Sequence, residues 1–233
     1  MGAVDESLHG AVLDELGALV VAGGYTAGQV LRIEQLEARF GVSRTVVREA
    51  VRVLESMGLV SSRRRVGITV SARASWNLFD PRVIRWRLDS ADRESLLRSL
   101  GELRRGVEPV AASLAATHAT PEQCGRLTGA VMQMAVHGRA GDLESYLAAD
   151  VLFHRTLLEA SGNDMFGGLS TVIAEVLAGR THHRLMPAFP EPAAIRWHAE
   201  VAEAVQAGDP AQAQRAMRDI LEEATRAMLG PDG

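Results

Sequence analysis

The sequence predicts a mostly α-helical protein in two parts, a small domain of helices and a β-hairpin followed by an all-helical bundle. Two short segments with apolar residues at helical spacing flank a glycine turn at residue 41. A stretch rich in β-branched residues with a basic, glycine-containing tip follows them. From residue 91 onward the pattern is helical almost throughout, with about six or seven helices and no convincing strand.

The elements of the first domain are defined by their end signals. Residues 8–21 have apolar positions at helical spacing and stop at the glycine-rich "AGGYTAG". "RIEQLEARFG" is a second helix that ends at Gly41, and the third helix begins after Ser43, a good N-cap, and runs to Gly58. "LVSSRRRVGITVSA" is typical of a two-stranded wing. The sequence therefore predicts a winged helix-turn-helix over residues 1–75.

Charge is distributed unevenly along the chain. The whole chain carries −4, but residues 32–73 contain nine arginines and four glutamates, a local +5, so the remainder carries −9. Arg44, Arg48 and Arg52 follow one another at steps of four and line one face of the third helix. Such asymmetry indicates a nucleic-acid-binding part attached to another domain.

The third helix is predicted to enter the major groove of DNA by its N-terminal end. Arginine suits this position because its planar fork bridges guanine O6 and N7 or grips a phosphate. Ser43 and Thr45 are expected to bind backbone phosphates. Three arginines at the wing tip would reach the flanking backbone or minor groove: Arg63, Arg64 and Arg65. The alternative is a solvated basic face on a small helical domain.

"GVSRTVVREAVRVLESMGLVSSRRRVG" resembles the winged helix of the GntR family of bacterial transcription regulators over roughly residues 8–73. The resemblance implies that Arg44 and Arg48 are the principal DNA-contacting arginines, supported by Ser43, Thr45 and the wing near Gly67. One position differs, because Glu34 stands where family members often have a DNA-contacting arginine. Either Arg32 takes over that contact, or the operator differs from the commoner type.

Residues 76–90 are expected to form a packed connector, and residues 91–230 a helical effector-binding domain. The stretch "WNLFDPRVIRW" is similar to the connector of FadR-type regulators of sugar-acid catabolism, such as those of galactonate or gluconate operons. A sugar acid combines a carboxylate with hydroxyl groups that can ligate a metal ion.

Four polar residues on three predicted helices of the second part lie on apolar stripes that should face the core: Arg104, Asp150, His154 and His198. A single inward histidine is more often a hydrogen-bonded core residue. Four together are better explained by a shared, water-accessible chamber. Carboxylate and imidazole ligands suit zinc, nickel, manganese or iron(II). The permanent charge of Arg104 would favour an anionic effector.

"ELRRGVEPVAASLAA", "DVLFHRTLLEASGN" and "HAEVAEAVQAGDPAQAQRAM" resemble the FCD domain of FadR-type GntR regulators. Metal-containing members of that group use one Asp and three His, and the resemblance assigns the first three ligands to Asp150, His154 and His198. Ile220 takes the place of the last histidine. Water or effector oxygens would then complete the site. Alternatively, His182 or His183 supplies the fourth ligand. A further alternative is that the metal is bound weakly or not at all.

The leading hypothesis is a cytoplasmic, homodimeric transcription regulator, a repressor rather than an enzyme, that binds operator DNA and responds to a small carboxylate or sugar acid. A dimer is expected because one recognition helix reads too few base pairs. The alternatives are a regulator that senses the metal itself, and a metalloenzyme bundle with a DNA-binding appendage. The lone Cys124 excludes a disulfide framework within the chain and fits a reducing compartment. No apolar run is long enough to predict a membrane span.

Overall fold

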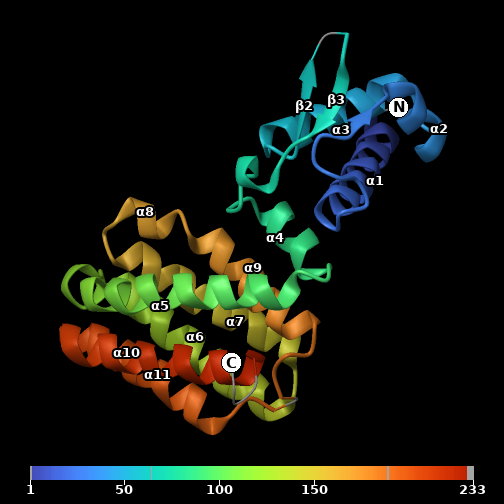
Figure 1. Ribbon diagram of the computed structural model, residues 1–233. Coiled ribbons are helices and arrows are strands. Elements are labelled where there is room, and N and C mark those ends of the chain that lie inside the picture. Colours follow the sequence, from blue (N-terminus) through green and yellow to red (C-terminus); the bar gives the residue numbers. More distant parts are fainter. Residues whose placement is uncertain (1, 64, 188, 230–233) are drawn as a thin grey trace. The chain divides into compact units, whose positions relative to one another are not determined.

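The computed structural model describes residues 2–63, 65–187 and 189–229 and confirms the mostly helical fold. The chain divides into two compact units, residues 1–93 and 94–233. The first unit has this order: α1 (Gly2–Val21), β1 (Val30–Leu31), α2 (Ile33–Phe40), α3 (Arg44–Ser56), β2 (Val60–Arg63), β3 (Gly67–Val70), the short 3-10 turn Arg73–Ser75 and α4 (Pro81–Leu88). Figure 1 shows the hairpin β2–β3 standing out from the helices of this unit.

The helix-turn-helix forms where its end signals predict. Gly41 ends α2 in the left-handed conformation, at φ 64°, which glycine adopts without steric cost. The Ser43 hydroxyl accepts a hydrogen bond from the Val46 amide at the start of α3, at 3.5 Å. Gly58 follows α3 at φ 75°, and a Cβ built there would lie 2.0 Å from the Ser75 carbonyl oxygen. Only glycine allows the chain after α3 to pass so close to the later turn.

The wing belongs to a three-stranded antiparallel sheet with the order β1-β3-β2. The sequence predicted the hairpin, and its register pairs Val60 with Val70. The additional strand β1 was not predicted. It contains two residues, which pair with Thr69 and Ile68 of β3. It pairs with β3 on the side opposite β2.

Residues 76–90, which the sequence predicts to be a packed connector, lie within the first compact unit. Val83 and Trp86 of α4 are part of the same apolar core as α1 and α3. The Trp86 ring lies so close to Gly17 of α1 that a Cβ there would come within 2.3 Å of it. After α4, Asp92 pairs with the buried Arg87 at 2.7 Å and with Arg73 at 3.0 Å. These contacts hold the end of α4 to the segment that follows the wing.

The second unit contains seven helices among its described residues, within the predicted range. They are α5 (Arg93–His118, beginning one residue before the boundary), α6 (Pro121–Ala140), α7 (Leu143–Ala160), α8 (Asp164–Gly167), α9 (Ser170–His182), α10 (Pro192–Ala207) and α11 (Pro210–Leu229). Figure 1 shows the long helices of this unit gathered into a bundle. None of the described helices is long and apolar enough to cross a membrane.

Helix α7 lies at the centre of this bundle. Its residues contribute to the main apolar core, for example Phe153 and Leu157, and to a smaller cluster through Leu147 and Leu158. Asp150 and His154 are on the same helix and are buried with them. Helix α5 contains Pro109 in its interior, one residue after the buried Glu108. The bundle therefore surrounds a group of charged side chains with apolar packing.

Candidate functional site

Helix α3 has one buried apolar face and one exposed basic face. Its inward residues are Val46, Val47, Ala50, Val51 and Leu54. The predicted DNA-contacting residues Ser43, Arg44, Thr45 and Arg48 are all exposed. The next arginine, Arg52, is also exposed and pairs with Glu49 of the same helix at 2.6 Å. Packing of the apolar side thus leaves the basic side free to meet a ligand.

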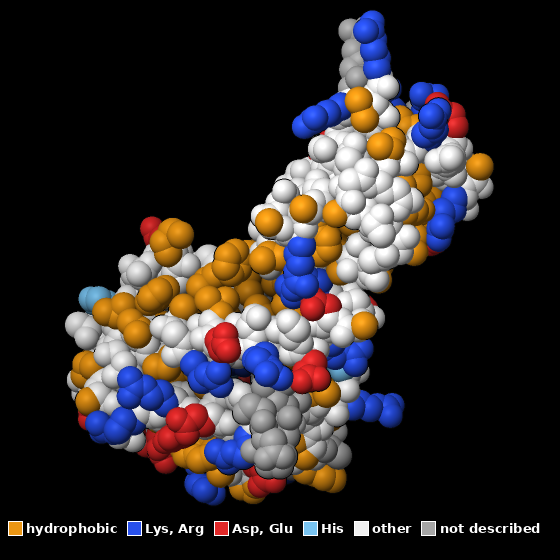
Figure 2. Space-filling view, viewed as in Figure 1, with side chains coloured by type: hydrophobic (Ala, Val, Ile, Leu, Met, Phe, Trp, Pro, Cys, Tyr) orange, Lys and Arg blue, Asp and Glu red, His pale blue; other side chains and the backbone are white. Residues whose placement is uncertain are grey.

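A hollow of about 490 Å³ lies between α3 and the wing, and four arginines line it: Arg44, Arg48, Arg52 and Arg63. Arg65 is exposed at the wing tip in the left-handed conformation, at φ 69°. Gly67 begins β3, and Arg64 lies outside the described residues. Figure 2 shows basic side chains gathered around the wing of this unit. Arg44 and Arg48 of the helix and Arg63 of the wing therefore line one hollow.

The position that departs from the resemblance lies on the same surface. Arg32 is exposed just before α2, and Glu34 is in the first turn of that helix. The Glu34 carboxylate Oε1 lies 3.1 Å from Nη1 of Arg44, with both side chains exposed. A negative charge therefore stands beside the first arginine of α3.

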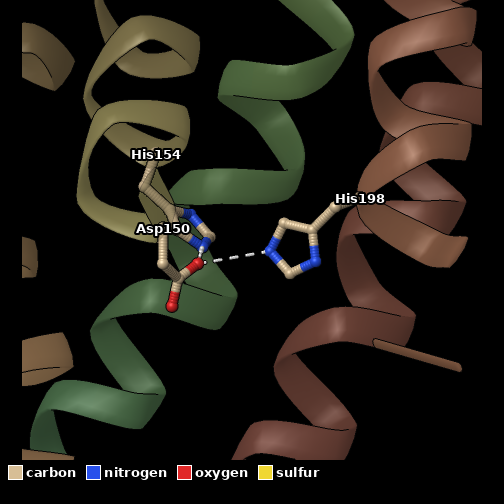
Figure 3. A group of neighbouring side chains, drawn as sticks. All are labelled: Asp150, His154 and His198. Atoms are coloured by element: carbon tan, nitrogen blue, oxygen red, sulfur yellow. Dashed lines mark ion pairs between the residues drawn. The ribbon is translucent and has the colours of Figure 1, made fainter. Parts of the chain in front are cut away.

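The four inward polar residues of the second unit come together. His154 Nε2 lies 3.3 Å from Asp150 Oδ1 and 3.3 Å from Arg104 Nη2. His198 Nε2 lies 3.4 Å from the same Asp150 oxygen. Figure 3 shows both imidazole rings directed at this carboxylate, with Asp150 and His154 on one helix and His198 on another. Each of the four residues is at most 3% exposed.

The second nitrogen of each imidazole fixes which atom faces Asp150. His198 Nδ1 donates to the Ala194 carbonyl oxygen at 2.7 Å, so Nε2 carries the lone pair when the ring is neutral. His154 Nδ1 lies 2.5 Å from Glu108 Oε2. Glu108 therefore faces Nδ1 of this ring, while Nε2 faces Asp150. Both Nε2 atoms are therefore oriented as ligands, by partners typical of metal-bound histidines.

Two further residues, Glu108 and Arg180, belong to the cluster and were not predicted from the sequence. Glu108 is fully buried, one helical turn after Arg104, and pairs with its Nε at 2.5 Å. Arg180 of α9 places Nη2 3.4 Å from Asp150 Oδ2. Signals for both were present, because Glu108 is four residues from Arg104, and Arg180 follows the buried Val176 and Leu177 at helical spacing.

The charges of the cluster stabilise one another. Burial raises the pKa of Glu108, but Arg104 and His154 outweigh burial and lower it from 4.5 to about 2. Burial likewise raises the pKa of Asp150, while the nearby imidazoles of His154 and His198 and the guanidinium of Arg180 hold it well below its usual range. Burial lowers the pKa of His154, but Glu108 and Asp150 outweigh this effect and raise it. Both carboxylates are therefore ionised at neutral pH.

The donor set fits a divalent metal ion. Asp150, His154 and His198 each offer one ligand atom, and these atoms lie within 4.8 Å of one another. Asp150 Oδ1 and His198 Nε2 are buried without a hydrogen-bond partner, which is costly unless something else binds them. The position of the fourth family ligand is apolar, since Ile220 is 3% exposed within the main core. The residues present therefore form a three-ligand set.

The two other histidines considered as a fourth ligand do not join the set. His182 is exposed and lies 3.5 Å from Glu144, and His183 is absent from the group that the described residues form. The expected chamber is also different, because its residues are tightly buried. The hollows described in this unit have other linings, such as one of about 760 Å³ beside Cys124, Gly125 and Gly208. A ligand must therefore displace neighbouring side chains to reach the cluster.

Comparison with known proteins separates the chain into the same two parts. Residues 8–70 match the family described as bacterial regulatory proteins, gntR family, and residues 99–223 match the FCD domain. The galactonate operon transcriptional repressor of Escherichia coli is 31% identical over 69% of this chain and 70% of its own length. The uncharacterized regulator YieP of the same organism is 30% identical over 75% and 76%.

The comparison of structures agrees with these matches. A GntR protein of Streptococcus agalactiae has a TM-score of 0.53 to this chain and 25% identity. The similarity covers 94% of this chain and 99% of that protein.

Proposed function

The chain belongs to the GntR family of bacterial regulatory proteins and carries an FCD domain, so it is a transcription regulator rather than an enzyme, and we propose that it is a homodimeric repressor controlled by a sugar acid. GntR regulators bind operator DNA. In this proposal the operator affinity depends on a small carboxylate that binds, together with a divalent metal ion, at Asp150, His154 and His198.

The first step is DNA binding by α3 and the wing. Arg44 and Arg48 are exposed on the face that the buried residues leave free, and Arg63 lines the same hollow. Arg44 and Arg48 would reach base edges, while Ser43, Thr45 and the wing near Gly67 hold the phosphate backbone. A homodimer supplies two such surfaces, which a palindromic operator needs.

The second step is binding of the effector, and the observation that supports it most directly is the pair of orphaned ligand atoms, Asp150 Oδ1 and His198 Nε2. A divalent ion there would supply positive charge and leave coordination positions for oxygens of a bound carboxylate and hydroxyl. Glu108 and the Ala194 carbonyl fix the two imidazoles in the orientation that this requires.

The charge balance favours an anionic ligand. Arg104 and Arg180 carry two positive charges, and Glu108 and Asp150 carry two negative charges, so the buried cluster is neutral when both histidines are neutral. A divalent ion would add two positive charges that burial makes costly without a counter-ion. Arg104 stands beside His154 and would bind a carboxylate, as an arginine fork does. The name of the galactonate operon repressor, a relative, makes an aldonate the first effector to test.

Regulation requires that the effector bind two arrangements of the protein unequally. The cluster is buried, so a ligand that reaches it must move the helices that carry it. These are α5, α7, α9 and α10. The proposal therefore predicts that ligand binding and operator release are coupled, with the reciprocal effect of operator on ligand.

The test uses the full chain with an operator obtained by selection from random duplex DNA. Metal-stripped and zinc-loaded protein are compared for operator affinity, each with and without galactonate. His198→Ala is the variant, and His182→Ala is its control, because it removes an exposed imidazole outside the cluster. We expect the aldonate to weaken operator binding at least tenfold in the zinc-loaded protein and in H182A, and to have no effect in H198A.

Three other results would decide against parts of the proposal. If zinc alone releases the operator and aldonates do nothing, the protein is a metal sensor. If H198A keeps both its zinc and its full response, the site lies elsewhere. If Arg44→Ala with Arg48→Ala binds the operator as tightly as the unmodified chain, α3 is not the recognition helix.

A further inference from the structure

The ion pair between Glu34 and Arg44 links the two helices of the helix-turn-helix. Glu34 is in the first turn of α2, and Arg44 is the first residue of α3. Glu34 Oε1 lies 3.1 Å from Arg44 Nη1, and the two side chains are 64% and 56% exposed. The pair is therefore on the surface that the proposed function places against DNA.

We propose that Glu34 is a positioning residue that fixes Arg44 for reading a base edge and keeps it away from phosphates. This inference rests on the proposed function of DNA binding by α3. A guanidinium has five N–H donors, and the ion pair with Glu34 is made through Nη1. The remaining donors are free to meet a base, and the anchored side chain has fewer arrangements to lose on binding.

The charge of Glu34 works in the same direction. A free surface arginine binds any phosphate that it can reach, and such contacts provide the sequence-independent part of DNA affinity. A carboxylate beside Arg44 competes with phosphate for the guanidinium and also repels the DNA backbone. At the operator, a hydrogen bond between a base edge and the remaining donors of Arg44 offsets the affinity that Glu34 removes. Unrelated DNA offers no such base contact. Glu34 therefore lowers non-specific affinity more than operator affinity.

Arg48 provides an internal comparison, because the described residues show no ion pair to its side chain, and it lines the same hollow as Arg44. Arg52 has a carboxylate partner, but that partner, Glu49, is on its own helix and would move with it. Among the ion pairs of the described residues, Glu34–Arg44 is the one that joins α3 to α2. We expect Arg44 to act as a fixed base reader and Arg48 to be the more adaptable contact.

The test compares Glu34→Gln with Glu37→Gln, which removes the same charge one turn further along α2, where the described residues show no partner arginine. Both proteins, with the unmodified chain and Arg44→Ala, are titrated with the selected operator, with each single-base variant of its half-site, and with unrelated duplex DNA at several salt concentrations. All four are used as full-length chains without effector.

We expect E34Q to bind unrelated DNA more tightly, with a salt dependence steeper by about one released counterion, since Arg44 gains a phosphate contact. One base pair of the half-site should lose its preference in both R44A and E34Q. A good arginine–guanine contact discriminates by roughly fivefold to a hundredfold, so the operator-to-unrelated affinity ratio should fall at least fivefold in E34Q. E37Q should keep every base preference.

Two results would overturn the inference. In the first, E34Q and E37Q behave alike. In the second, E34Q gains affinity equally for all sequences while the base preferences stay intact, which would make Glu34 a simple repulsive charge. If the unmodified chain shows no salt-dependent DNA binding, the proposed function itself fails, which is a separate result.

Discussion

Replacing Glu108 by glutamine tests whether the buried charge cluster stabilises the helical unit. Glu108 is fully buried and pairs with Arg104 and His154, each at 2.5 Å. Glutamine keeps the size of the side chain but removes its charge, so Arg104 would be left buried without a carboxylate. Removing one partner of a buried pair costs about 3–5 kcal/mol.

The pKa of Glu108 gives a second value for the free energy of unfolding that Glu108→Gln should remove. The folded chain lowers this pKa from 4.5 to about 2. Each pKa unit corresponds to about 1.4 kcal/mol, so the difference corresponds to about 3 kcal/mol in the free energy of unfolding at neutral pH. Because the folded pKa is the lower one, this stabilisation is present above pH 4.5 and is lost as the pH falls toward 2.

The assay is urea unfolding with a chelator present, so that no metal ion contributes. Trp197 is the one tryptophan of residues 94–233, so Trp76→Phe with Trp86→Phe gives a background in which fluorescence reports this unit alone. Glu102→Gln is the control, because Glu102 is exposed on the same helix. E108Q should lose about 3 kcal/mol at pH 7 relative to E102Q, and the difference should shrink below pH 4.5. Equal stability of the two variants, or a difference independent of pH, would refute the reasoning.

Two further substitutions test the metal site and the glycine after α3. Ile220→His should place a histidine at the position where metal-containing relatives of the FCD group have their fourth ligand. Zinc binding, measured by competition with a chelating dye, should then tighten on the order of tenfold or more. Unchanged zinc affinity would mean that position 220 does not face the site. Gly58→Ala should destabilise the first unit by at least ~1 kcal/mol, because its φ is 75° and its Cβ would meet the Ser75 carbonyl. Thermal unfolding should show this loss, and Gly10→Ala, at an open helical position, should show none.

Much of the fold could be predicted because its signals are local. Ser43 and Gly41 define the helix-turn-helix by their own backbone preferences, and the breaks of the bundle fall at glycine and proline turns. The strand β1 could not be predicted in this way, because two residues carry no periodicity and the strand exists only through pairing with β3. Likewise, the placement of residues 76–90 depends on the contact of Trp86 with Gly17, which is distant in sequence.

The candidate site also has features that local sequence signals predict and features that depend on how distant helices pack. Inward polar positions on apolar stripes predicted the meeting of Arg104, Asp150, His154 and His198, since helical periodicity settles which face a side chain occupies. Periodicity does not state how far apart two helices lie. It therefore could not decide that His182 stays outside the group, or that the cluster is closed rather than an open chamber.

The proline inside α5 has a consequence for how this cluster responds to a ligand. Pro109 has no amide hydrogen, so the carbonyl of Arg105 lacks the donor that a regular helix would supply. Arg104 and Glu108 lie beside this missing backbone hydrogen bond. The N-terminal half of α5 begins at Arg93, where the first unit ends. Bending the helix here breaks one fewer bond than bending it elsewhere. A shift of the buried charges would therefore change the angle between the two halves of α5 more easily here than at any regular turn of the helix.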